Sequence, residues 1–401
     1  YHDWFPEIVY DQHQMGSDGP RLFLPPYADP INPNVDPLIT AQVNLLGKYV
    51  VAGLQQKGFH GVVTGTVFNA FFEGTMSKTP LWHNRIGILS EMASARIASP
   101  LYFPKGSVQG MGRGLPQNKP QTNFLDPWDG GWWRLRDIID YEKAVTYRLL
   151  EYAARFKRDV KKNFYSLNRK AIALGSAQAP RAYIIPADQH DVSAGLSLVE
   201  RLLIAGVNVT QTTAPLVAGG RSIPSGSYVI ALAQPARAYV KDLFEVQKYP
   251  NLLDYPGGPP QRPYDVTGWT MPMAMGVEAV RIDTALSMET TPVVEVLLSG
   301  RVPKRRDGYY VLERRHGESY AMVNDLLKMK VPVFELGEAR GALERGTFAI
   351  PADGVDAALI QEYARRWRIP VEELEGDRPL QLHKVRSARI GIYQPWVTSM
   401  D

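Results

Sequence analysis

Histidine is the residue type from which this chain could build a metal site or a catalytic base, because the sequence contains no cysteine. That excludes disulfides, thiolate zinc sites and cysteine nucleophiles. The seven histidines are His2, His13, His60, His83, His190, His316 and His383. A catalytic zinc site needs three protein ligands and a base near the metal-bound water, yet none of these belongs to a His-x-x-x-His or His-x-x-Glu motif. No standard short motif therefore assembles a complete zinc site.

His13 has the most suggestive surroundings of the seven. It ends a short apolar run that starts near Glu7, and Gly16 follows it in a turn. A metal ligand at a strand end beside an open loop is held firmly while the loop leaves room for substrate. The same pattern also fits a histidine that only forms a hydrogen bond at the end of a strand. Both interpretations stay open from the spacing alone.

Glu91 ends a second apolar run, which begins near Asn84. Short apolar runs of this kind are typical of buried strands in an α/β sheet, and chemistry often sits where such strands end. The two runs therefore place an imidazole and a carboxylate where a sheet could present them together.

The segments Val9–Gly16 and Gly87–Ser94, which contain His13 and Glu91, resemble the second half of the catalytic domain of the zinc carboxypeptidase A-like family. The resemblance implies that His13 is the third zinc ligand and that Glu91 is the general base. It also implies Zn²⁺ as cofactor, the C-termini of peptides or proteins as substrate, and an extracellular or periplasmic location.

The family's first two zinc ligands and its substrate-binding arginines precede the third ligand, so the resemblance places them outside this chain. The isolated chain is then expected to be inactive, because one imidazole cannot retain zinc. Gln14-Met15-Gly16 departs from the Ser-Tyr found in digestive members, which leaves the substrate specificity open. The alternative is a catalytically inactive, peptidase-like protein that binds a ligand or a partner.

Aromatic residues near these positions have two possible roles. Phe68, Phe71 and Phe72 lie where the family has its substrate-side loop, but packing is the alternative for each. Trp128, Trp132 and Trp133 could form a binding platform or could pack against the helix that follows.

Three other patterns carry less chemistry. Gly106-Ser107 lacks the Gly-x-Ser-x-Gly elbow of a serine hydrolase, and the glycines from Gly110 to Gly114 lack the preceding strand of a dinucleotide loop. Asp188 and His190 could be a ligand pair or a base with the group that orients it, but the corresponding positions near Arg314 and His316, in a later segment of similar sequence, lack the acid. We interpret that pair as part of a surface loop.

The helices and strands expected around these residues indicate an α/β fold with a duplicated α/β domain in its second part. The resemblance implies that the first part is a partial three-layer α/β/α zinc-carboxypeptidase domain. Leu38 to Lys57 shows helical spacing closed by Gly58, and a long helix is expected from about 137 to 164. The expected units are a catalytic-domain part (1–115), a Trp-rich connector with a long helix (116–180), the duplicated domain (181–385) and the start of a further, truncated α/β domain (386–401). In this last unit, Arg389–Trp396 resembles the first strand of a class I glutamine amidotransferase-like domain.

The duplication is expected because Leu198–Val209 matches Met322–Val333. In each copy a strand precedes this segment, and a second strand and a helix follow it. The repeats span about 181–250 and 308–375, and we expect them to pair into one α/β domain. The run from Ala388 to Trp396 is expected to be the first strand of the last unit. Both ends of the chain look cut.

Composition sets broad limits on function. The chain has 401 residues, of which 45% are hydrophobic and 21% charged, with a net charge of +4. These values are typical of a globular protein, and the scattered basic residues argue against a nucleic-acid partner. No run approaches the roughly 18 apolar residues of a membrane span. The oligomeric state stays unknown.

Overall fold

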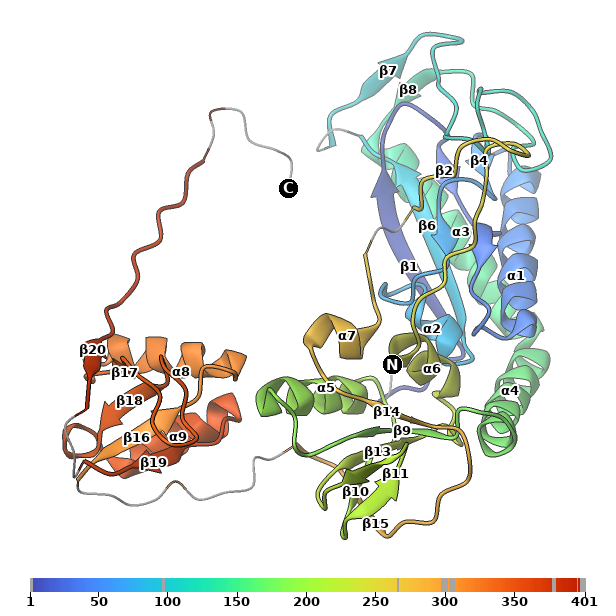
Figure 1. The fold of residues 1–401 in the computed structure, drawn as a ribbon. Helices are drawn as coiled ribbons and strands as arrows, with labels where there is room; N and C mark the ends of the chain where they lie inside the picture. Colours follow the sequence, from blue (N-terminus) through green and yellow to red (C-terminus); the bar gives the residue numbers. More distant parts are fainter. Residues whose placement is uncertain are drawn as a thin grey trace.

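The computed structural model describes residues 3–95, 98–264, 267–296, 302, 307–376, 380–394 and 396. Helices and strands are interspersed along the described residues, so the chain is of the general α/β class (Figure 1). The elements form a first domain and two smaller units, each built on its own five-stranded sheet.

The first domain is built on a four-stranded sheet with the order β1-β6-β2-β4. Its strands are β1 (Ile8–Met15), β2 (Leu22–Phe23), β4 (Val62–Val63) and β6 (Ile86–Ala93). Strand β1 runs parallel to β6, whereas β2 runs antiparallel to β6. Both strands predicted from apolar runs are therefore confirmed, and they are neighbours in the sheet.

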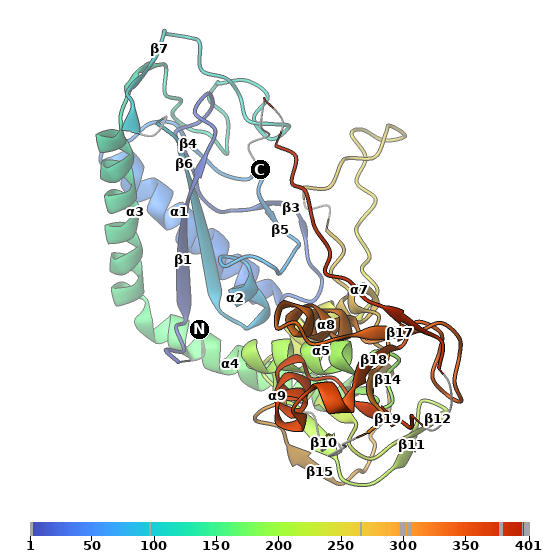
Figure 2. The ribbon, with the colours of Figure 1, turned by 90° about the vertical axis from the view of Figure 1, so that its left-hand side faces the viewer.

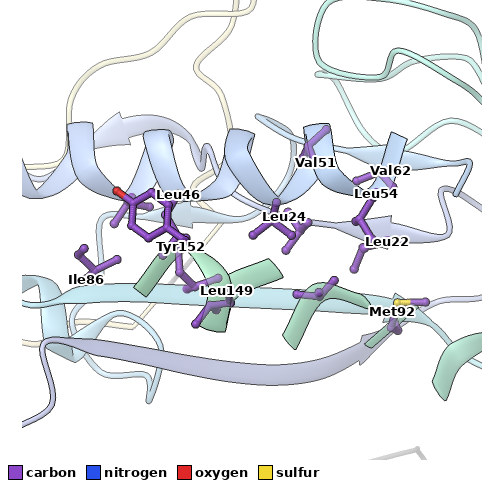
Figure 3. Close-up of a cluster of buried hydrophobic side chains, with 14 of the residues drawn as sticks. Leu22, Leu24, Leu46, Val51, Leu54, Val62, Ile86, Met92, Leu149 and Tyr152 are labelled. Carbon is purple, nitrogen blue, oxygen red and sulfur yellow. The ribbon is translucent and has the colours of Figure 1, made fainter. Parts of the chain in front are cut away.

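Three long helices accompany this sheet: α1 (Pro37–Gln56), α3 (Leu135–Arg155) and α4 (Lys157–Ala177). Asp36 caps α1 by accepting a hydrogen bond from the Leu38 N–H, which satisfies one of the free donors of the first turn. Helices α1 and α3 cover one face of the sheet (Figure 2). Leu46 of α1 and Leu149 of α3 meet the strands there in a continuous apolar core (Figure 3).

Loops and the short helix α2 (Thr79–Trp82) occupy the opposite face. A second apolar cluster lies there, formed by Phe23, Val63, Leu89 and Phe124 among others. Two short sheets flank the domain: β3 (Ala28–Ile31) with β5 (Asn69–Ala70), and β7 (Leu101–Phe103) with β8 (Gly131–Trp133). Three full layers were expected. In the described residues, long helices cover only one face of the sheet, and loops with the short helix α2 cover the other.

The segment expected to be a connector is part of the first domain's core. Trp133 is 2% exposed and packs in the same cluster as α1 and α3. The single long helix predicted for this region is instead two helices separated at Phe156. Phe156 leaves helical geometry there, and its ring packs edge-on against Tyr49 of α1. Local propensity favoured one helix, and packing against α1 accompanies the break.

The first repeat contains β9 (Ala182–Ile185), α5 (Val192–Ile204), β10 (Thr210–Thr212), β13 (Tyr228–Ala231) and α6 (Arg237–Phe244). It continues through α7 (Met271–Met275), β14 (Val280–Ile282) and β15 (Thr290–Pro292), with a separate hairpin of β11 (Leu216–Ala218) and β12 (Arg221–Ile223). The sheet order is β14-β9-β13-β10-β15.

The second repeat contains β16 (Tyr309–Leu312), α8 (Gly317–Lys328), β17 (Phe334–Leu336), β18 (Phe348–Pro351) and α9 (Ala357–Trp367). Edge strands β19 (Glu372–Leu374) and β20 (Leu382–Lys384) complete the sheet order β19-β16-β18-β17-β20. This order matches that of the first repeat strand for strand, so the elements expected from the duplication are confirmed and the match extends to both edge strands.

The two repeats do not share a sheet, so the expectation that they pair into one α/β domain needs correction (Figure 1). Each repeat pairs its own five strands with one another, and in the described residues no strand of one repeat is bonded to a strand of the other. The repeats touch instead between α5 and α8. The Gly317 N–H donates to Asp191 Oδ2 at 2.9 Å, and Arg368 forms a two-pronged ion pair with Glu200.

The strand expected from Ala388 to Trp396 is not formed in the described part of this segment. Ile390, Ile392 and Tyr393 are 86–92% exposed and pair with no sheet there. A strand requires a neighbour for its backbone groups, and an apolar run alone does not supply one. Of the helices in the described ranges, none combines the length and apolarity required to cross a membrane.

Candidate functional site

The register of β1 and β6 places His13 directly opposite Glu91. Neighbouring strands lie about 4.8 Å apart, so the two side chains start from adjacent points of the sheet. Because side chains alternate between faces, His13 and Glu91 share a face with Asp11 and Leu89. Leu89 belongs to the apolar cluster on the loop side, so the site lies on the face that α1 and α3 do not cover.

Polar contacts on the helix side hold this register. Tyr10 donates to Glu142 Oε2 at 2.5 Å, and Ser90 Oγ donates to Glu142 Oε1 at 3.1 Å. Gln12 reaches Thr146 of the same helix. A slip of one residue would turn each of these groups to the other face, so α3 determines which side chains of β1 and β6 point toward the loops.

Asp11 and His13 form the exposed edge of the site. His13 Nε2 lies 3.2 Å from Asp11 Oδ1, and the His13 side chain is 56% exposed whereas that of Asp11 is 10% exposed. A carboxylate that holds one ring nitrogen fixes the orientation of an imidazole, and many metal-binding histidines use this arrangement. The imidazole is therefore both oriented and accessible.

Glu91 is only 8% exposed, and burial raises its pKa to about 7. His13 and Lys78 lower this pKa, whereas the charge of Asp11 raises it. A carboxyl group that titrates near neutral pH can accept and release a proton under physiological conditions. Glu91 thus has the property expected of a general base.

Residues from distant segments cover the site. Lys78 is 3% exposed, and its ammonium group lies 5.3 Å from the ring centroid of Tyr264. Tyr264 belongs to the segment between α6 and α7, and its ring packs edge-on against Phe68. Arg113 and Asp254 form an ion pair that also joins this segment to the first domain. A loop of the first repeat therefore forms part of the wall around the first domain's carboxylates.

The sequence predictions about aromatic residues have mixed outcomes. Phe68 and Phe71 are buried, and Phe72 packs against Trp269, so packing is confirmed for all three. Trp128 and Trp133 pack against the helix side of the domain and, with Phe103, surround the guanidinium of Arg21. Trp132 is 53% exposed and stacks on Tyr102.

Asp188 and His190 are both exposed, and Asp188 pairs with Arg221 at 3.4 Å. Their interpretation as a surface loop is confirmed.

The sequence did not indicate roles for Asp11 and Lys78 at the site. Asp11 lies two residues before His13 on the same strand, and this spacing indicates that both side chains lie on one face of the sheet. Lys78 has no such signal, because it reaches the site only through the tertiary fold.

The residues that the structure describes do not by themselves fit a zinc ion. They contain no group of three or more histidine, aspartate or glutamate side chains placed to hold a metal. The site offers one imidazole, and a carboxylate already engages its Nε2. A zinc centre here would need ligands beyond those of the described residues.

Comparison of the chain with protein-family models, with curated proteins and with solved structures finds no match. The geometry of the site is therefore the basis for any statement about function.

Proposed function

We propose that the first domain is the C-terminal part of a metallocarboxypeptidase-like catalytic domain that removes C-terminal residues from peptides. The observation that carries the proposal is the placement of His13 beside Glu91 on the loop-covered face of the sheet, with a Glu91 pKa of about 7. An accessible imidazole and a neighbouring base that titrates near neutrality suit the activation of water. An extracellular or periplasmic location belongs to the same proposal.

In this function Glu91 accepts a proton from the attacking water and delivers it to the amine that leaves. Lys78 and His13 favour the ionised form of Glu91 near neutral pH, because both lower its pKa against the effect of burial. Asp11 orients the His13 ring. A zinc ion would polarise the scissile carbonyl, with His13 as one ligand and the remaining ligands supplied from elsewhere.

A second candidate function is ligand or partner binding without catalysis. It is favoured by the lack of a metal-holding group among the described residues and by the engagement of His13 with Asp11. In that case Asp11, His13 and Glu91 would form a polar recognition site. The two functions differ in whether zinc is retained and peptide bonds are cleaved.

The test is zinc content and hydrolysis of hippuryl-L-phenylalanine, measured on the full-length protein that contains this chain. Glu91→Gln is expected to retain zinc and to lower kcat by about 10²- to 10⁴-fold, the usual contribution of a general base. His13→Ala is expected to lose zinc. Asp129→Asn removes an exposed carboxylate of the same domain and is the matched control.

If the wild-type protein neither retains zinc nor cleaves the substrate, the peptidase proposal fails and the binding function replaces it. If His13→Ala retains zinc at the wild-type level, His13 is not a ligand. The control variant is expected to match the wild type in both measurements.

A further inference from the structure

His83 lies at the contact between the first domain and the first repeat. It directly follows α2 and is 9% exposed, and its ring packs on that of Tyr239 of α6 with the centroids 4.7 Å apart. Helices α2 and α6 lie side by side in Figure 1. The next residue, Asn84, donates from Nδ2 to the Pro235 carbonyl at 3.0 Å. His83 therefore belongs to the surface on which the first repeat is docked, and the proposed function does not use it.

Both ring nitrogens of His83 lie against carbonyl oxygens. Nδ1 is 3.0 Å from the Thr79 oxygen of the first domain, and Nε2 is 3.0 Å from the Ala205 oxygen of the first repeat. A carbonyl oxygen can only accept a hydrogen bond, and a neutral imidazole has a single N–H to donate. One nitrogen of a neutral ring would therefore turn its lone pair toward an oxygen. The imidazolium form donates to both oxygens, so this geometry favours the protonated ring.

The partner of Nε2 is the end of a helix. Ala205 is the C-cap residue of α5. The last carbonyl groups of a helix have no partner within it and carry the negative end of its dipole, which attracts a cation. Arg201, in the last turn of α5, donates to Ser197 of its own helix. Docking of the first repeat therefore brings a negative helix end to the His83 ring.

Helix α6 brings further ionisable groups to this surface: Arg237, Tyr239, Lys241 and Asp242. Lys241 pairs with Glu245 at 2.9 Å. Burial raises the pKa of Asp242 against the hydrogen bonds that this carboxyl forms, and burial followed by the charge of Glu73 raises the pKa of Tyr239. Both acids therefore hold their protons more firmly in the docked protein than in water. Their change on docking has the same sign as that expected for His83.

The charged neighbours within the first domain include Glu73 and Arg85. Glu73 acts on Tyr239, whose ring packs on His83, so its negative charge lies on the side that favours an imidazolium. The Arg85 guanidinium lies 6.0 Å from the ring centroid of Phe164. Arginine keeps its charge at every pH that a folded protein meets. Arg85 therefore adds no pH dependence of its own.

We propose that the contact between the first domain and the first repeat is a proton-dependent switch, in which protonated His83 ties the two units together and deprotonation loosens them. The docked protein then binds more protons than the separated units, so the stabilisation is present in mild acid and is lost as pH rises. The segment between α6 and α7, which covers the side of the sheet with His13 and Glu91, belongs to the first repeat. The switch therefore reaches that site, but the inference does not depend on the proposed function.

The first measurement is a proton–nitrogen NMR titration of the imidazole groups of the full chain from pH 5 to 9, at intervals of about half a unit. His83→Phe identifies the signals of His83. At about pH 7 the His83 ring is expected to carry a proton on both nitrogens, whereas the exposed His190 should be mostly neutral, because an ordinary histidine titrates near about 6.5. A single neutral tautomer of His83 at that pH would overturn the inference.

The second measurement is hydrogen exchange of the backbone amides of residues 202–209, which include Ala205, corrected for the intrinsic rate at each pH. The ratio of protection in the wild type to that in His83→Phe is expected to fall about 10-fold between mild acid and mild alkali, which corresponds to a shift of one unit in the titration of one group. The corresponding segment of the second repeat, residues 326–333, is the internal control. Its ratio should not change with pH.

His83→Gln is the second variant, because its amide keeps an N–H donor but cannot take up a proton. Its protection is expected to show the same weak dependence on pH as that of His83→Phe, and it decides the test if the phenylalanine variant does not fold. A wild-type ratio that stays constant with pH would show that His83 only packs against Tyr239 and would overturn the switch. Neither measurement uses peptidase activity, so the proposed function stands or falls separately.

Discussion

His13 and Glu91 occupy paired positions on the parallel strands β1 and β6, on the face of the sheet opposite α1 and α3. Their helix-side neighbours, Gln12 and Ser90, contact α3. The same packing that buries one face therefore aligns the imidazole and the carboxylate on the other.

Ionisation of Glu91 is predicted to destabilise the fold. Its pKa in the folded protein is about 7, above the ordinary value near 4.5, so the folded state binds more protons than the unfolded state between these pH values. Stability should therefore fall as pH rises from about 4.5 to 7. Glu91→Gln removes this cost and should raise the free energy of unfolding at pH 8 by up to about 3 kcal/mol.

Chemical denaturation from pH 4.5 to 8.5 measures the effect. The difference between Glu91→Gln and wild type should shrink toward the acidic end, whereas Asp129→Asn should follow the wild type throughout. A difference that is constant with pH would contradict the raised pKa of Glu91.

The charges beside Glu91 are predicted to shift its pKa in opposite directions. Asp11→Asn removes a negative neighbour and should lower the Glu91 pKa below about 7, whereas His13→Ala removes a group that lowers the pKa and should raise it. Carbon-13 NMR titration of the side-chain carboxyls in metal-free protein measures both shifts, with Glu91→Gln identifying the resonance. Shifts of the same sign would show that these side chains do not face Glu91 as the structure places them.

Arg21 is predicted to tolerate methionine better than lysine. Its guanidinium is fully buried between three aromatic rings, with the Trp128 centroid at 4.4 Å, and it donates to the carbonyls of Ser17 and Gly19. Lysine keeps the buried charge but lacks the planar group that stacks on these rings. Methionine removes the charge that is costly to bury.

We expect Arg21→Lys to lower the free energy of unfolding by roughly 1–3 kcal/mol, and Arg21→Met to lower it less. Urea denaturation followed by tryptophan fluorescence measures both. Arg136→Met, at a side chain that is 74% exposed, should have little effect. Equal or smaller loss with lysine would show that the aromatic packing is not specific for the guanidinium.

Asp191 is predicted to join the two repeats in a pH-dependent way. Burial alone would raise its pKa, but hydrogen bonds from His316, Gly317, Ser193 and Ala194 outweigh burial and hold the pKa well below its usual range. The stabilisation is therefore present above the ordinary aspartate pKa and is lost as pH falls toward the depressed value. Asp191→Asn should cost about 1–2 kcal/mol at pH 7 and progressively less in acid.

Asp356→Asn is the matched control, because Asp356 caps α9 within the second repeat by accepting from the Ala358 N–H. Thermal denaturation should show a larger loss for Asp191→Asn than for Asp356→Asn at neutral pH. If the two losses are equal, the bond to Gly317 contributes nothing beyond a helix cap.

Local patterns in the sequence predicted several of the helices and strands of this protein. Apolar runs and helical spacing predicted β1, β6 and α1, and the similarity of Leu198–Val209 to Met322–Val333 predicted the matching order of elements in both repeats. The same patterns placed His13 and Glu91 on strands. These predictions succeeded because side-chain periodicity depends only on residues a few positions apart.

Tertiary structure alone decided which strands are neighbours and what surrounds each polar group. Strands β1 and β6 are distant in sequence, and their pairing brings His13 to Glu91. Lys78 and Tyr264 reach the site from other segments of the chain. The repeats form two separate five-stranded sheets, although their matching sequences did not show whether they would share one. Such contacts depend on the free energy of packing over the whole chain, which no short stretch of sequence contains.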